Sequence, residues 1–173
     1  DEVLYLDFDV VPNTNENFFE VWDLSKGICV LNNNERVSPI QKITERTQTI
    51  RSPNAKYYNA QAMLIEKGLS PTNDVINTGI VGISKKHLDQ DDLKLMTSLI
   101  GVYDLFPKKI ADFFGYDNET LFAVKLKEKK VPVQWLDQDW HYFFDSQMFI
   151  PVTAKLIHAI NKRFDLIWKH IDD

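Results

Sequence analysis

Short apolar runs separated by helix-like segments constrain the fold of this chain most. Residues 3–8 and 75–83 are apolar almost throughout, which is typical of strands buried on both faces, although residues 77–79 interrupt the second run. Shorter apolar runs predict strands at 28–31, 131–136 and 155–160. The intervening patterns predict helices at 15–24, 57–67, 89–105, 118–129 and 163–170, and a long loop at 32–53. Strands that alternate with helices indicate an α/β fold with a mainly parallel sheet flanked by helices.

The composition is typical of a globular protein. The 173 residues are 44% hydrophobic and 26% charged, and they suffice for a single domain across 1–173. The formal charge of -5, with no basic stripe, argues against a nucleic-acid partner. No apolar stretch approaches the ~20 residues that cross a bilayer. Cys29 is the one cysteine, so the chain has no internal disulfide, which fits a reducing compartment and a cytoplasmic location.

Two aspartates interrupt the first apolar run. Asp7 and Asp9 are one residue apart, so a strand running through both would place their carboxylates on the same face. Carboxylates that share a face repel each other unless a cation or a proton neutralises them. The carboxyl ends of strands are also where open α/β sheets bind ligands. The pair therefore predicts a divalent cation, Mg²⁺ or Mn²⁺, and the capping of local amides is the alternative.

Further segments follow these aspartates in an order that resembles a known family. After "LYLDFDVVP" come "VINTGIVGIS", "DNETLF", "VPVQWLDQDWHYF" and "AKLIHAINK". Together they resemble the GT-A glycosyltransferases, most closely the family-8 type, which includes glycogenin-like and bacterial galactosyltransferases. The resemblance runs from Val3 to about Trp168. It implies a GT-A type, Rossmann-like sheet and a retaining hexosyltransferase that moves a sugar from a nucleotide-diphosphate sugar, a UDP-sugar, to an acceptor hydroxyl of a carbohydrate.

The resemblance also implies roles for individual residues. Asp7, Asp9 and His158 would be the ligands of Mn²⁺ or Mg²⁺, and a neutral imidazole suits that chemistry. Asp117 would be the catalytic acid that orients the sugar. The substrate-binding residues would be Asn77, Thr78, Gly79, Asp117, Trp140 and Lys162.

Some of these assignments have competitors within the chain. Asp137 and Asp139 compete with Asp117, because "DQD" also resembles the family's acid, and we prefer Asp117 because a helix follows it. Gly79 would let the backbone approach a ligand closely. Lys162 would contact phosphate, but "NKRFDLIW" lacks the proline of the family's K-P-W ending.

The start of the chain and two rival functions complete the expectations. Only Asp1 and Glu2 precede the first strand, so we expect the C-terminal part of the GT-A fold, without the section that grips base and ribose. One rival is a haloacid-dehalogenase-like phosphatase with Asp7 as nucleophile and Asp9 as general acid/base. We find no later strand ending in paired acids to support it. The other rival is a non-catalytic carbohydrate-binding remnant.

Overall fold

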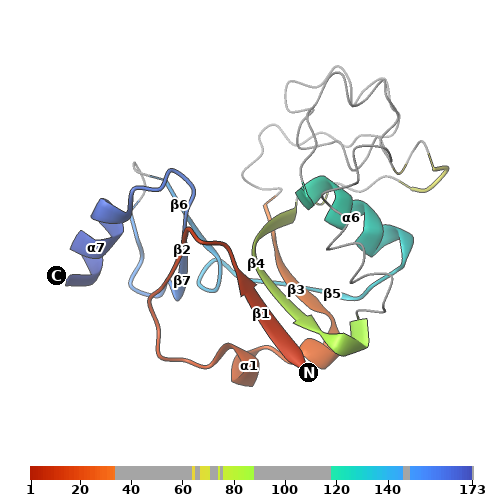
Figure 1. Ribbon diagram of the computed structural model, residues 1–173, viewed down its shortest axis with the longest axis horizontal. Helices are drawn as coiled ribbons and strands as arrows, with labels where there is room; N and C mark the ends of the chain where they lie inside the picture. Colours follow the sequence, from red (N-terminus) through yellow and green to blue (C-terminus); the bar gives the residue numbers. More distant parts are fainter. Residues whose placement is uncertain are drawn as a thin grey trace, which may run out of the picture. The chain divides into compact units, whose positions relative to one another are not determined.

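A computed structural model of the chain describes residues 1–33, 64, 67–70, 74, 76–87, 118–145 and 149–172 (Figure 1). The chain divides into two compact units, which we describe one at a time. The first unit comprises Asp1–Leu31, Thr78–Lys85 and Val133–Asp173, and the second comprises Asn32–Asn77 and Lys86–Pro132. The predicted loop at 32–53 and the predicted helices at 57–67 and 89–105 lie wholly or mostly outside the described residues.

One sheet has the strand order β1-β4-β3-β5. Its strands are β1 (Glu2–Leu6), β4 (Ile76–Ser84), β3 (Ile28–Asn32) and β5 (Val133–Trp135). β1 pairs antiparallel with β4, and β3 pairs parallel with β5. The prediction that the second strand is interrupted at residues 77–79 is wrong, because β4 passes through these residues without a break.

The prediction that the first strand is buried on both faces is also wrong. β1 stands at the end of the described sheet, and its side chains alternate between solvent and core. Val3 is 60% exposed and Tyr5 46% exposed, whereas Leu4 and Leu6 pack against a buried cluster. Val and Tyr at outward positions make such a strand look apolar on both faces, because apolar residues also occur on solvent-facing sides.

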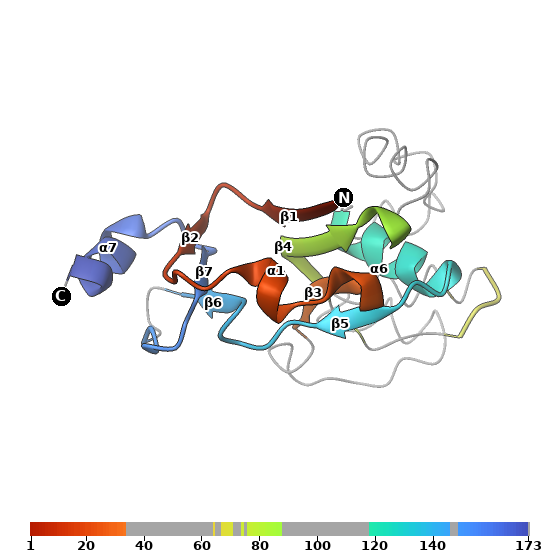
Figure 2. The ribbon, with the colours of Figure 1, turned by 90° about the horizontal axis from the view of Figure 1, so that it is seen from below.

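A second sheet has the order β2-β7-β6. Its strands are β2 (Val10–Pro12), β7 (Leu156–Ala159) and β6 (Tyr142–Phe144), with β2 antiparallel and β6 parallel to β7. Figures 1 and 2 both show these strands side by side, with α7 (Phe164–Asp172) next to them. Ile167 of α7 is fully buried in a cluster formed with residues of all three strands. The α/β class is therefore confirmed, with parallel and antiparallel pairs in both sheets.

A second core cluster includes buried side chains of the two short helical segments that follow β2. Asn17 caps α1 (Phe18–Val21) by accepting a hydrogen bond from the Phe19 amide, and a single 3-10 turn, η1 (Leu24–Lys26), follows. The predicted helix at 15–24 is therefore present in shorter form. The buried cluster consists of Phe18, Leu24, Cys29, Ile80, Leu136, Trp140 and Leu156.

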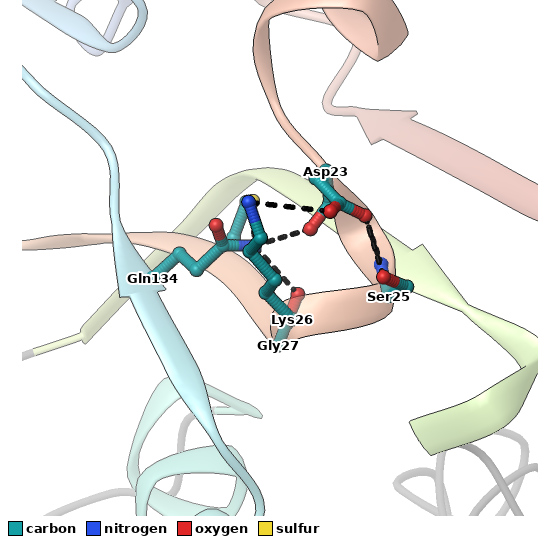
Figure 3. A network of polar contacts seen from close by, with 6 residues as sticks. Asp23, Ser25, Lys26, Gly27 and Gln134 are labelled. Atoms are coloured by element: carbon teal, nitrogen blue, oxygen red, sulfur yellow. Dashed lines mark hydrogen bonds and ion pairs between the residues drawn. The ribbon is translucent and has the colours of Figure 1, made fainter.

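A side-chain amide ties β5 to the start of β3 (Figure 3). Gln134 Nε2 donates to the carbonyl oxygens of Asp23 at 2.9 Å and Gly27 at 3.2 Å. Asp23 in turn caps η1, because its side chain accepts hydrogen bonds from the amide and hydroxyl of Ser25. The Asp23 carbonyl oxygen also accepts a hydrogen bond from the Lys26 amide at 3.0 Å, so Gln134 adds a second donor to this turn.

The second unit contains the predicted helix at 118–129 as α6 (Asn118–Glu128), and a 3-10 turn, η4 (Lys85–His87), follows β4. Glu128 at the end of α6 pairs with Lys67 and Lys125, each at 2.8 Å. The helices that the structure describes all fall short of the length and apolar character that a membrane span requires.

Candidate metal centre

Asp7 and Asp9 lie in a tight turn and not on a continuous strand. β1 ends at Leu6 and β2 begins at Val10, and the Val10 amide donates to the Asp7 carbonyl oxygen at 3.1 Å. The argument that a strand places both carboxylates on one face therefore does not apply. The two side chains lie close together because both belong to this one turn, which spans Asp7 to Val10.

Main-chain hydrogen bonds fasten this turn to two other strands. The Asp7 amide donates to the Gly79 carbonyl oxygen of β4 at 2.8 Å. The Ala159 amide at the end of β7 donates to the Asp9 carbonyl oxygen, also at 2.8 Å. In the β2–β7 register, Val10 lies opposite His158. The turn is therefore held against the strand that carries the histidine.

The structure brings Asp7, Asp9 and His158 together. Each offers one ligand atom, and these atoms all lie within 4.8 Å of one another. His158 Nε2 is 3.3 Å from Asp9 Oδ1. The set combines carboxylate oxygens with an imidazole nitrogen, which is a donor set that suits Mn²⁺ or Mg²⁺.

The charges of this cluster are not balanced by its own residues. Asp9 and His158 are buried, and the 3.3 Å contact between Asp9 Oδ1 and His158 Nε2 is not a well-aligned hydrogen bond. Burial lowers the pKa of His158, although the Asp9 and Asp7 carboxylates act in the opposite direction. Even a protonated imidazole would balance only one of the two carboxylates. A buried carboxylate oxygen without a well-aligned hydrogen bond is costly, so the residues present fit a divalent cation.

Tyr5 supports one ligand from the exposed side of β1. Its hydroxyl donates to Asp7 Oδ1 at 2.5 Å. This hydrogen bond and the burial of the ring raise the pKa of Tyr5 to about 12. Sequence reasoning missed this residue, although its position two residues before Asp7 on a strand was a usable signal, because such residues share a face.

The His158 imidazole is enclosed by two groups that sequence reasoning did not connect with it. His141 Nε2 lies 3.1 Å from His158 Nδ1. A Cβ atom at Gly79 would lie 2.3 Å from His158 Cε1, so only glycine leaves room for the ring there. Gly79 thus admits a histidine side chain, whereas the sequence predicted a contact with substrate.

Lys162 lies beside the aspartate turn. Its ammonium group is 4.8 Å from the centroid of the Phe8 ring, which is 80% exposed between the two aspartates. The Lys162 amide donates to the Ala159 carbonyl oxygen, and its φ of 55° is left-handed. Lys162 therefore contacts the residue between the two aspartates, and its contact with phosphate stays a prediction.

The other predicted substrate contacts are not tested by the geometry of this cluster. Trp140 is 2% exposed and packs edge-to-face on Phe18 in a core cluster, with its ring also covered by Lys155. Asn77 belongs to the second unit, and Asp117 lies outside the described residues. Thr78 precedes Gly79 on β4. The substrate-binding roles of these residues stay predictions.

The structure gives hydrogen-bond partners for Asp137 and Asp139, the two acids that compete with Asp117. Asp137 Oδ1 accepts hydrogen bonds from the amides of Asp139 and Trp140, so it caps the turn that begins there. Asp139 Oδ1 accepts from the Thr153 hydroxyl at 2.7 Å. The Asp137 carbonyl oxygen accepts from the amide of His141, which joins this turn to the His158 environment.

Comparison with known proteins adds little to this geometry. No protein-family model and no curated protein matches the chain. Among solved structures, it is similar to the crystal structure of an active-site mutant of LgtC, with a TM-score of 0.47 and 19% identity over 92% of this chain. The match covers 53% of the LgtC chain, so this chain spans about half its length. A likeness at this level carries no weight by itself.

Proposed function

We propose that this chain is a GT-A type catalytic domain, across 1–173, of a metal-dependent glycosyltransferase. The reaction is transfer of a sugar, a hexose, from a nucleotide-diphosphate sugar to an acceptor hydroxyl. The family resemblance adds retention of the anomeric configuration and a UDP-sugar as donor. The observation that carries the proposal is the convergence of Asp7, Asp9 and His158, with a buried Asp9 oxygen whose contact with His158 is not a well-aligned hydrogen bond.

The family resemblance and the geometry support the same site by independent routes. The resemblance selects the three residues by their motifs. The geometry joins them through the aspartate turn and the β2–β7 pairing, and it depends on no alignment with another protein. A chance resemblance has no reason to place a histidine beside two aspartates that lie at the other end of the chain.

Each residue near the cluster has a part in this chemistry. Asp7, Asp9 and His158 would hold the cation, and Tyr5 keeps the Asp7 carboxylate in place. A bound divalent cation would supply positive charge where the departing diphosphate becomes more negative. The Lys162 ammonium group adds a second positive charge for the same oxygens. Asp117, or alternatively Asp139 on the turn that leads to His141, would orient the sugar.

An assay of donor turnover tests the proposal. The protein is freed of metal and incubated with a panel of nucleotide sugars, with and without Mn²⁺ or Mg²⁺, and release of the nucleoside diphosphate is followed. We expect release that depends on metal and is lost in Asp9→Asn. Asp165→Asn is the matched control, because it makes the same chemical change at an exposed aspartate that pairs with Arg163.

The two rival functions give different results in this experiment. Phosphatase turnover that disappears in Asp7→Asn, without donor turnover, would favour the dehalogenase-like enzyme. Donor binding by calorimetry without any turnover would favour a carbohydrate-binding remnant. Equal donor turnover by wild type and Asp9→Asn would contradict the proposed role of the cluster.

A further inference from the structure

The His158 ring presents its two nitrogen atoms to different partners. Nε2 faces Asp9 Oδ1 at 3.3 Å, on the side where Asp7 also lies. Nδ1 faces His141 Nε2 at 3.1 Å, in the buried interior. One nitrogen atom is therefore directed towards the candidate ligands, and the other towards a second imidazole.

A histidine that binds a cation through Nε2 must carry its proton on Nδ1. The bond that this second nitrogen makes fixes the tautomer and the orientation of the ring. Metal-binding histidines usually donate this proton to a carboxylate, a backbone carbonyl or water. Here the atom that lies within hydrogen-bond distance of Nδ1 is Nε2 of another histidine. An imidazole accepts at Nε2 only when its own proton is on Nδ1.

The fold holds His141 in a fixed place for such a role. The residue is 1% exposed, and its amide donates to the Asp137 carbonyl oxygen at 3.1 Å. The two histidine rings lie 5.3 Å apart between centroids, and the Phe143 ring packs edge-to-face against His158. In the β6–β7 pairing, Phe143 lies opposite His158, so the chain next to His141 is in register with the ligand strand.

We infer that His141 is a positioning residue that holds His158 in the tautomer with its proton on Nδ1. Its Nε2 accepts that proton, and the lone pair of His158 Nε2 then points towards Asp7 and Asp9. The inference rests on the proposed metal site. It assigns to a buried residue a role that acts through His158.

Two substitutions separate this role from simple packing. Gln places its side-chain oxygen near the position of the histidine Nε2, so His141→Gln keeps an acceptor. His141→Phe keeps a planar ring and removes the acceptor. We expect His141→Phe to bind Mn²⁺ 10–100-fold more weakly than wild type by calorimetry, and His141→Gln to recover most of the loss. Urea unfolding of both variants shows whether each is folded.

A spectroscopic measurement on the wild-type protein tests the same point without a substitution. Nitrogen NMR of the histidine side chains, with diamagnetic Mg²⁺ bound, reports which nitrogen atom carries the proton. We expect the protonated atom of His158 to be Nδ1. This readout decides the question even if His141→Phe does not fold.

The possible outcomes distinguish this inference from the function on which it rests. Wild-type protein that binds neither Mn²⁺ nor Mg²⁺ would overturn the metal site, and the role of His141 with it. Tight binding by wild type and His141→Phe alike would overturn the role of His141 alone. A proton on Nε2 of His158 with Mg²⁺ bound would overturn it as well.

Discussion

Gly79→Ala is the substitution whose effect on the candidate metal centre follows most directly from the geometry. A Cβ atom at this position would lie 2.3 Å from His158 Cε1 and 2.5 Å from His158 Nδ1, where ordinary contact begins at 3.4 Å. The ring would have to retreat by about 1.1 Å, or β4 would have to move. A displaced ring would leave its place beside the aspartates. A displaced β4 would move Asp7 away from His158, because the Gly79 carbonyl oxygen accepts a hydrogen bond from the Asp7 amide.

The expected magnitudes differ for stability and for metal affinity. Overpacking of this kind costs about 1–3 kcal/mol of the free energy of unfolding. Metal–ligand distances tolerate deviations of only about 0.2 Å, so a ring displaced by roughly 1 Å no longer serves as a ligand. We expect the affinity for Mn²⁺ to fall at least about 10–100-fold, by calorimetry on the metal-free protein.

Gly82→Ala on the same strand is the matched control. A Cβ atom at Gly82 would lie 2.8 Å from Phe18 Cε1 and 2.9 Å from Leu24 Cδ2, in a core cluster that contains none of the candidate metal ligands. It should destabilise the fold by a similar amount and leave the Mn²⁺ affinity unchanged. Combining Gly79→Ala with His158→Ala should restore stability relative to Gly79→Ala alone, because the clash disappears, without restoring affinity. Wild-type affinity in Gly79→Ala would refute the reasoning.

Three further predictions concern other parts of the structure. Burial raises the pKa of the Cys29 thiol to about 12 from its ordinary 9.0, so the unfolded chain loses the thiol proton first as the pH rises. The stability of wild type should therefore fall more steeply than that of Cys29→Ala between about pH 9 and 12 in urea titrations, and parallel curves would argue against this. Gln134→Leu removes hydrogen bonds to two main-chain carbonyls before β3, and we expect a loss of about 1–3 kcal/mol in the free energy of unfolding with unchanged Mn²⁺ affinity. Lys162→Ala should raise the KM for the nucleotide donor about tenfold, because it removes a positive charge proposed to contact the diphosphate. Mn²⁺ affinity should stay the same, because the ammonium group lies over Phe8 and is not one of the three candidate metal ligands. An unchanged KM would show that Lys162 does not contact the phosphate groups.

Residue chemistry made the candidate ligands recognisable from the sequence. Two aspartates one residue apart and a histidine in an apolar strand are unusual enough to be singled out. Their surroundings were harder to predict. The contact between His141 and His158 joins residues on different strands, and nothing in their spacing indicates it. The close approach at Gly79 depends equally on how β4 and β7 are brought together.

The fold was predictable where an apolar run or a helical pattern stands apart in the sequence. α6 and the strands at 28–31, 131–136 and 155–160 were found to within a few residues of their bounds. β2 and β6, of three residues each, were not predicted as separate strands. The turn at Phe8 and Asp9 was missed because apolar residues continue on both sides of it, so the sequence pattern does not show where β1 ends.

The pairing of β2 with β7 joins segments from opposite ends of the chain. Closing such a long loop is entropically unfavourable, and the cluster can form only once the chain from residue 7 to residue 158 has been synthesised. A cation held by Asp7, Asp9 and His158 would act as a tether between the two ends, and its binding energy would oppose their separation. Proteolytic removal of the last 20 or so residues would therefore abolish that tether while sparing every strand of the β1-β4-β3-β5 sheet.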